Sequence, residues 1–151
     1  MATISQGPIS LASATYQNTP PFVPPITDGK VIKTYDGDTI TVAAQMLGEP
    51  IYRFNVRIKG IDCPEMKSKD PTEKEIALKA KAFVQDLLLN QRVQLENVET
   101  EKYGRLLADV LYQGVSVGDM LVREHLAVRY DGGHKQVPDN WVEYWNSRQT
   151  E

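Results

Sequence analysis

The chain contains 151 residues, of which 41% are hydrophobic and 25% charged, and its 17 Lys and Arg against 20 Asp and Glu give a net charge of −3. This length suits one domain, and the composition is that of an ordinary folded protein. No run approaches the roughly 18 apolar residues of a transmembrane helix, so we expect no membrane partner. The one cysteine excludes an internal disulfide and a cysteine-rich zinc site. The mild acidity argues against a protein whose main task is tight, passive binding of nucleic acid.

The first 29 residues differ in composition from the rest. They hold five of the nine prolines and seven Ser and Thr, but only one charged residue, Asp28. We therefore expect a flexible N-terminal arm over residues 1–29 and a folded domain over residues 30–151; the alternative is an arm docked on this subunit or a neighbouring one. The arm lacks a basic start followed by a long apolar stretch, so no signal peptide is evident. The sequence does not indicate the cellular compartment.

Apolar and turn-forming residues predict five strands in the folded domain. The turn dipeptide Asp36-Gly37 separates the first two. In the third, apolar side chains from Tyr52 to Ile58 alternate with polar ones, which gives the strand one apolar and one polar face. The predicted strands span residues 31–34, 39–44, 51–59, 91–98 and 106–112.

Three helices are expected between and after these strands. Asp70-Pro71-Thr72-Glu73 has the pattern of a helix start with a capping box, and an apolar stripe follows from Ile76 to Leu88. A second helix opens at Ser116 and ends near His125, where we expect the imidazole to interact with the helix dipole. A third spans residues 138–148. This order predicts an α+β fold, a five-stranded OB-type β-barrel with three α-helices.

Two short acidic motifs are brought together by the predicted hairpin. Asp36-Gly37-Asp38-Thr39 and Asp62-Cys63-Pro64-Glu65 are each, taken alone, typical of a solvated turn or loop. If strands 38–45 and 51–59 pair around residues 47–49, Thr39 lies opposite Arg57. Asp38, Arg57 and the loop at Asp62 then lie at one end of the sheet, so two distant acids meet beside a cation.

A third motif, Glu101-Lys102-Tyr103-Gly104-Arg105, enters the last strand. The three motifs D-G-D-T, R-x-x-x-x-D-C-P-E and K-Y-G-R-x-L-A occur in this order between about Lys30 and Tyr130. Together they resemble the staphylococcal-nuclease-like (thermonuclease) family. The resemblance implies a barrel with three helices and calcium-dependent hydrolysis of DNA and RNA. It also implies that the P–O5′ bond is cleaved, which leaves 3′-phosphate ends.

The resemblance also implies roles for individual residues. By this resemblance, Asp38, Asp62 and the backbone carbonyl of Cys63 are the calcium ligands. Glu65 is the general base, and Arg57 and Arg105 bind the scissile phosphate. These types suit the chemistry, because Ca²⁺ takes oxygen ligands and guanidinium groups grip phosphate oxygens in pairs. Cys63 stands where the family usually has Thr; its thiol is expected to be a small packing residue.

Substrate contacts implied in the same way are Lys102 and Tyr103, on a neighbouring phosphate. Tyr130 is the aromatic residue nearest to the position of the family's nucleotide-stacking tyrosines, and the glycine-containing segment 131–135 follows it. The expected partner is DNA, RNA or both, and the sequence does not indicate any protein partner. Cations that offset the overall acidity locally are Arg53, Arg57, Lys59, Lys67 and Lys69.

The alternative is a catalytically silent module of the same fold that binds nucleic acid or a protein. Such a module is expected to lose Arg57, Glu65 or Arg105, and all three are present. An OB-type binder should also expose aromatic residues on its strands, whereas Tyr52 and Phe54 fall on the apolar face of theirs. A purely structural barrel leaves the clustered ionic residues unexplained. The sequence therefore favours the enzyme.

Overall fold

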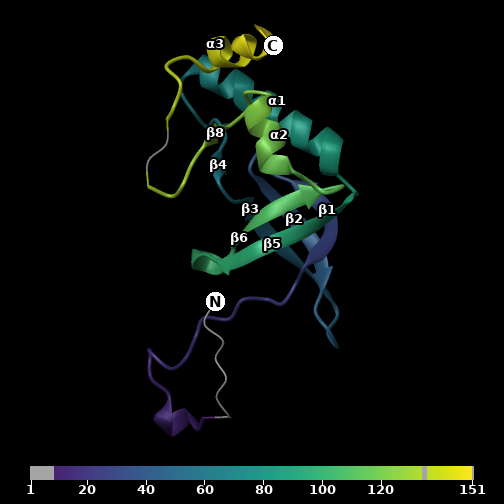
Figure 1. The fold of residues 1–151 in the computed structure, drawn as a ribbon, viewed down its shortest axis with the longest axis vertical. Coiled ribbons are helices and arrows are strands. Elements are labelled where there is room, and N and C mark those ends of the chain that lie inside the picture. The colour runs from purple at the N-terminus through teal and green to yellow at the C-terminus, as the bar shows by residue number, and fades with distance from the viewer. Residues whose placement is uncertain (1–8, 134–135, 151) are drawn as a thin grey trace.

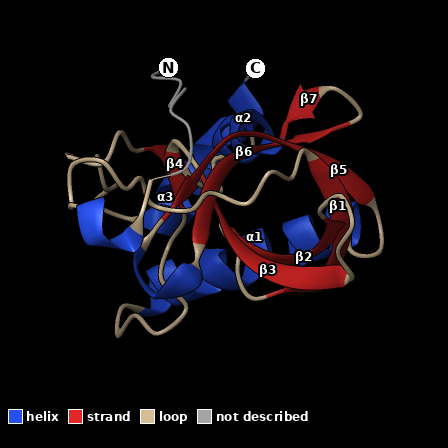
Figure 2. Cartoon of the chain, turned by 90° about the horizontal axis from the view of Figure 1, so that it is seen from below, coloured by secondary structure: helices blue, strands red, loops and turns tan. Residues whose placement is uncertain are grey.

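Five strands curl into a closed barrel in the computed structural model, which describes residues 9–133 and 136–150 (Figure 1). The strands lie in the order β3-β2-β1-β5-β6, and a parallel pairing of β3 with β6 closes the ring (Figure 2). This confirms the predicted fold class. The barrel strands are β1 (Asp28–Thr34), β2 (Thr39–Gln45), β3 (Ile51–Ile58), β5 (Arg92–Thr100) and β6 (Leu106–Tyr112).

The closing pairing is short. It joins Val56, Arg57 and Ile58 of β3 to residues 106–108 of β6, three residue pairs in all. Along the rest of its length, β3 pairs only with β2. Consequently Val56 and Ile58 are buried, but Tyr52 near the start of the strand is 45% exposed. The predicted apolar face of β3 is therefore buried only toward its end, because the start of the strand extends past the barrel wall.

Three helices lie together at one end of the barrel (Figure 1). They are α1 (Pro71–Leu88), α2 (Val117–Arg123) and α3 (Trp141–Asn146). Helix α1 begins as predicted, with the Asp70 carboxylate accepting the Thr72 N–H at 2.9 Å. Its buried residues, Ile76, Ala77, Ala80, Val84 and Leu88, repeat at helical spacing and join the barrel core. Helix α2 is capped by Ser116, as predicted, and α3 by Asn140, so α3 is shorter than residues 138–148.

Short elements complete the described chain. They are the strands β4 (Ile61–Asp62), β7 (Val115–Ser116) and β8 (Val128–Arg129), and the 3₁₀ turns η1 (Leu11–Ser13), η2 (Lys102–Gly104) and η3 (Ser147–Thr150). Strands β4 and β8 pair with each other outside the barrel sheet. Two-residue strands have too few positions to show an alternating pattern, which is why the sequence did not predict them.

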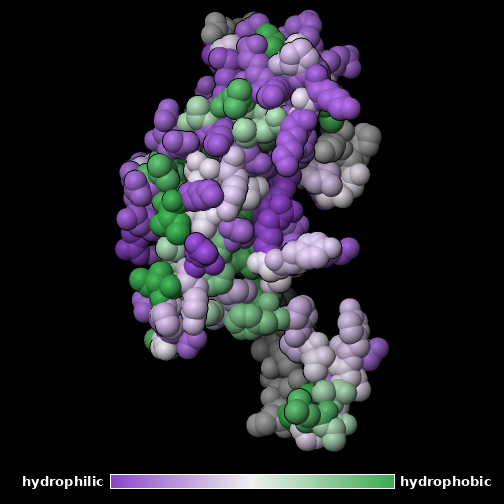
Figure 3. Space-filling model, turned by 180° about the vertical axis from the view of Figure 1, so that it is seen from behind, coloured by the Kyte–Doolittle hydropathy of each residue, from purple (hydrophilic) through white to green (hydrophobic). Residues whose placement is uncertain are grey.

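The segment before β1 extends away from the barrel in Figure 1 and meets it at its end. There Ile26 is 5% exposed and packs in the core, and the Leu95 N–H donates to the Thr27 carbonyl. The face drawn in Figure 3 is mostly hydrophilic, and its apolar residues occur in small separate groups. None of the helices within the described ranges is long and apolar enough to cross a membrane.

Candidate active site

Two buried carboxylates meet at the mouth of the barrel. Asp38 and Asp62 are 9% and 8% exposed, and they are the buried charged residues of the described part of the chain. Thr39 pairs with Arg57, and the Ile58 N–H donates to the Asp38 carbonyl, which confirms the predicted hairpin register. Buried charges are costly unless they are paired, so the surroundings of these acids have to compensate them.

Arg57 supplies that compensation. Its Nη2 lies 3.0 Å from Asp62 Oδ1 and 3.6 Å from Asp38 Oδ2, so one nitrogen stands between the two acids. Its Nη1 donates to the carbonyls of Ile58 and Ile61, at 2.8 and 3.0 Å. The two carbonyl bonds fix the guanidinium independently of the acids. The expected meeting of two distant acids beside a cation is thus observed.

Asp36 adds a third carboxyl that the sequence analysis treated only as part of a turn. Its Oδ1 accepts the Asp38 N–H at 3.2 Å. Burial, followed by the hydrogen bond and charge of the neighbouring Asp38 carboxylate, raises the pKa of Asp36 from 3.8 to about 6. The only sequence signal was the first acid in the string D-G-D, and this string does not reveal how deeply the turn is buried.

Helix α1 packs directly against this acidic turn. A Cβ atom on Gly37 would lie 2.7 Å from both Ala80 Cβ and Cys63 Sγ, so glycine is required there for space. Cys63 is 3% exposed, and burial raises the pKa of its thiol well above the usual value. Its side chain is therefore a packing residue, as expected, while its backbone N–H donates to Asp38 Oδ2 at 3.1 Å.

Glu65 lies on an exposed loop that follows the site. Its backbone N–H donates to Glu73 Oε2 at 2.8 Å, and the Ser68 hydroxyl donates to Glu73 Oε1 at 2.9 Å. Glu73 thus ties this loop to the first turn of α1, rather than closing a capping box on Asp70, whose N–H donates to Ser68 Oγ. The Glu65 carboxylate makes no hydrogen bond or ion pair within the described residues, and it is open to solvent.

Arg105 approaches the site from the neighbouring strand. Arg57 pairs with Leu107, and Arg105 precedes Leu107 by two residues, so both arginines lie on one face of the barrel. Arg105 Nε donates to Glu101 Oε1 at 2.8 Å. Glu101, Arg57 and Tyr130 together line a hollow of about 550 Å³. The structure therefore places Arg105 beside the site, held by Glu101, and not in contact with the two buried acids.

Of the remaining predicted contacts, Tyr130 lines this hollow, whereas Lys102 and Tyr103 do not. Lys102 and Tyr103 are exposed in η2, and Tyr103 has a left-handed backbone with φ of 64°. Tyr130 is anchored by its N–H on the Gly60 carbonyl, at 3.0 Å. Residues 134 and 135 of the segment after Tyr130 lie outside the described ranges. His125 directly follows the C-cap residue of α2, and its ring stacks on Tyr144 of α3, with centroids 4.3 Å apart.

The donor set suits a hard cation such as calcium. Carboxylate oxygens of Asp38 and Asp62 lie within reach of one guanidinium nitrogen, and Ca²⁺ and Mg²⁺ prefer oxygen ligands of this kind. No group of three His, Cys, Asp or Glu side chains in the described ranges is arranged to hold a metal by itself. A cation at this mouth would therefore complete its coordination with backbone, water or substrate oxygens, as expected for an open site.

Comparison with known proteins points to one family. Residues 55–146, more than half of the chain, match the family model described as staphylococcal nuclease homologue. This range includes Arg57, Asp62, Glu65 and Arg105, and it begins after Asp38.

Curated relatives agree with this match. The chain is 34% identical over 100 residues to a thermonuclease of Staphylococcus hyicus, which covers 65% of this chain and 56% of that protein. It is 33% identical over 86 residues to a probable endonuclease of Schizosaccharomyces pombe, which covers 52% of this chain and 37% of that protein. It is 28% identical over 125 residues to a micrococcal nuclease of Shigella flexneri, and the match covers 77% of this chain and 66% of that protein. The chain thus spans between 37% and 66% of these relatives, and it belongs to the staphylococcal nuclease family.

Proposed function

We propose that the protein is a calcium-dependent nuclease that hydrolyses phosphodiester bonds of DNA, RNA or both. In this proposal the P–O5′ bond breaks and a 3′-phosphate remains. One observation carries the proposal: two buried carboxylates from distant parts of the chain meet on Arg57, which itself lines a surface hollow. Membership of the nuclease family supports the reaction class. We assign the activity to residues 30–151 and regard residues 1–29 as an arm whose last residues enter β1.

Calcium would be held by Asp38, Asp62 and the backbone carbonyl of Cys63. When bound, it would offset phosphate charge and favour ionisation of the attacking water. A site with so few protein ligands is expected to be weak, with a Kd on the order of 10⁻⁴–10⁻³ M. Asp36 would add negative charge beside Asp38 and so favour cation binding.

Arg57 and Arg105 would hold the phosphate oxygens. Arg57 keeps two carbonyl bonds, so its guanidinium stays in position if Asp62 turns toward a cation. Arg105 would exchange Glu101 for a phosphate oxygen, one anion for another. Both interactions strengthen as negative charge builds on the phosphate in the transition state.

Glu65 would accept a proton from the water that attacks phosphorus. Its exposed carboxylate and ordered loop suit a base that meets solvent and substrate together. The new P–O bond forms as the P–O5′ bond breaks, and the departing 5′-oxygen takes up a proton. Lys102 and Tyr103 would contact a neighbouring phosphate, and Tyr130 would contact the nucleotide in the hollow beside Arg57.

The test is cleavage of end-labelled single-stranded DNA and RNA in calcium and in EGTA. We expect cleavage in calcium only, with products whose 3′ ends become extendable after phosphatase treatment. Asp62→Asn should abolish cleavage at low millimolar calcium, whereas Asp139→Asn, which removes an exposed acid before α3, serves as the charge control. Binding of the nucleic acid without turnover at any calcium concentration would refute the proposal in favour of a silent module.

A further inference from the structure

A groove on the outer face of β1, β2 and β3 differs in charge from four other hollows of the described surface. This β1–β3 groove has a volume of about 510 Å³ and is lined by Ile32, Lys33, Tyr35, Thr41, Arg53, Phe54, Asn55 and Gly104. It contains two cations and no carboxylate, although the chain carries a net charge of −3. Four further hollows on the described surface each include at least one Asp or Glu.

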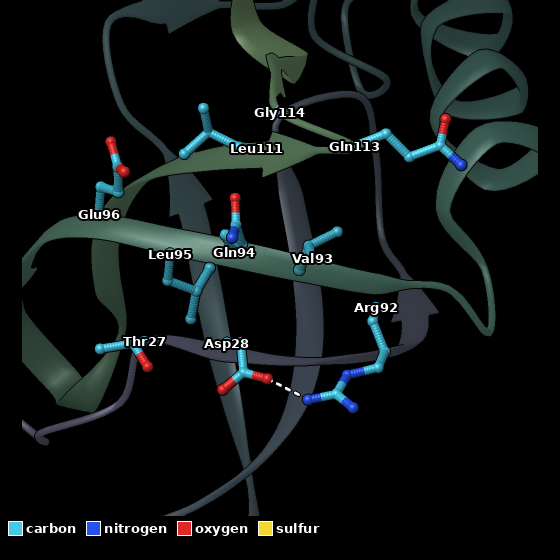
Figure 4. A pocket seen from close by; sticks show the side chains of 10 residues that line it. All are labelled: Thr27, Asp28, Arg92, Val93, Gln94, Leu95, Glu96, Leu111, Gln113 and Gly114. Atoms are coloured by element: carbon cyan, nitrogen blue, oxygen red, sulfur yellow. Dashed lines mark hydrogen bonds and ion pairs between the residues drawn. The ribbon is translucent and has the colours of Figure 1, made fainter.

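One of these hollows, of about 670 Å³, illustrates the difference. It lies over β5 and includes Asp28 and Glu96, and its one cation, Arg92, is already paired with Asp28 (Figure 4). In the β1–β3 groove, by contrast, Arg53 makes no hydrogen bond or ion pair with any described residue, and it is exposed. Lys33 Nζ lies 4.5 Å above the Tyr35 ring. Two cations are therefore available to an anionic ligand.

Strand register makes the groove a continuation of the candidate active site. Lys33 of β1 pairs with Thr41 of β2, which in turn pairs with Asn55 of β3. The next outward-facing row toward the mouth joins Thr39 to Arg57. Arg53 lies on the same face as Arg57, four residues back along β3, which is about 13 Å. A strand of nucleic acid held at Arg57 can therefore run directly into the groove.

Aromatic rings border the same path. Tyr35 is 45% exposed, and Tyr103, next to Gly104 on the rim, is fully exposed, whereas Phe54 packs against the barrel core. Unpaired bases stack on such rings, whereas the bases of a duplex are already stacked inside it. Cations beside open aromatic rings therefore fit a single strand better than a duplex.

We propose that the β1–β3 groove binds the stretch of single-stranded nucleic acid adjoining the scissile phosphate. Lys33 and Arg53 contact its phosphates, and Tyr35 contacts its bases. The position of the scissile bond rests on the proposed nuclease function. Because a stacked strand carries one phosphate per about 3.4 Å, the path from Arg57 to Arg53 spans at most about four nucleotides. Substrates shorter than this gain little from the groove.

The experiment compares cleavage of a 15-nucleotide oligo-dT with that of a dT trinucleotide, in calcium. In the double variant Lys33→Gln/Arg53→Gln, we expect kcat/KM for the 15-mer to fall about tenfold relative to the trinucleotide. The double variant Lys30→Gln/Arg123→Gln removes the same charge from exposed positions elsewhere and is the matched control. Equal length dependence in the two double variants overturns the groove proposal while leaving the nuclease proposal intact.

A binding measurement separates the groove from catalysis. Fluorescence anisotropy of labelled 15-mer in EGTA should show about tenfold weaker binding by Lys33→Gln/Arg53→Gln than by the control, and a salt slope smaller by about 1.4. Tyr35→Leu should weaken binding and Tyr35→Phe should not, because stacking needs the ring. If these binding differences are observed but the unmodified protein does not cleave, the groove proposal is supported and the nuclease proposal is refuted. Equal competition by polyglutamate, with no effect of Tyr35→Leu, would instead indicate an acidic protein partner and overturn the proposal.

Discussion

Replacing Asp36 by Asn should stabilise the metal-free protein above about pH 6. The folded state raises the pKa of this carboxyl to about 6, through burial and the adjacent Asp38. Below pH 3.8 the group is protonated in both states and costs nothing. As the pH rises through 3.8 toward 6, the unfolded chain ionises first, so the folded state loses stability. Asn keeps an oxygen acceptor for the Asp38 N–H and provides an N–H donor toward the Asp38 carboxylate.

The magnitude follows from the size of the shift. Two pKa units correspond to about 3 kcal/mol, and because Asp36 is only half-buried, solvent screening reduces this to about 1–2 kcal/mol. The unfolding free energy of Asp36→Asn should therefore exceed that of the wild type by this amount at pH 7. The gain should shrink steadily toward pH 4.

Urea unfolding in EGTA at several pH values between 4 and 8 measures this difference. Asp139→Asn, which removes an exposed acid, controls for the loss of one negative charge. In calcium the order should reverse, because the wild type then gains more from the cation than the variant does. A stability gain that does not change between pH 4 and pH 7 would refute the reasoning.

Three further substitutions test the site. Glu65→Gln should keep the fold but slow cleavage by about 10², measured as single-turnover rate; near-wild-type rates would remove Glu65 from the chemistry. Arg105→Ala should slow cleavage at saturating calcium by about 10². The control Glu101→Gln, which only releases Arg105 from its ion pair, should not slow cleavage. An unchanged rate in Arg105→Ala would mean that this guanidinium does not act on the scissile phosphate. Gly37→Ala should lower the unfolding free energy by about 1–3 kcal/mol, because its Cβ would overlap with α1. The control Gly133→Ala, which has room for a Cβ, should not lower it. Equal unfolding free energies of the two variants in urea would contradict the packing argument.

Local pattern and register carried most of the fold prediction. The pairing of Thr39 with Arg57 could be counted from the turn between β2 and β3, because a hairpin fixes which residues face each other. The caps at Asp70 and Ser116 were readable because they depend on a few neighbouring residues. Features set by packing between distant segments were not.

The burial of Asp36 and the hydrogen-bond partner of Glu73 could not be predicted from the sequence. The burial that raises the pKa of Asp36 comes from the tertiary packing around the turn, which no local pattern reveals. Glu73 has the spacing of a capping-box acid, yet it bonds the Glu65 N–H, because the preceding loop folds back onto the helix start. For Arg105 the motif gave the position directly before β6 but not its partner, since the pairing with Glu101 depends on the η2 turn.

The three residue pairs that close the barrel have a mechanical consequence. Arg57 lies within this closure and Arg105 lies at its entrance, on opposite sides of the same junction. Any loosening of β3 from β6 changes the spacing between the two guanidinium groups before it disturbs either strand internally. Substitutions such as Leu106→Ala, which thin the junction, should therefore impair phosphate binding at temperatures well below those at which the barrel unfolds.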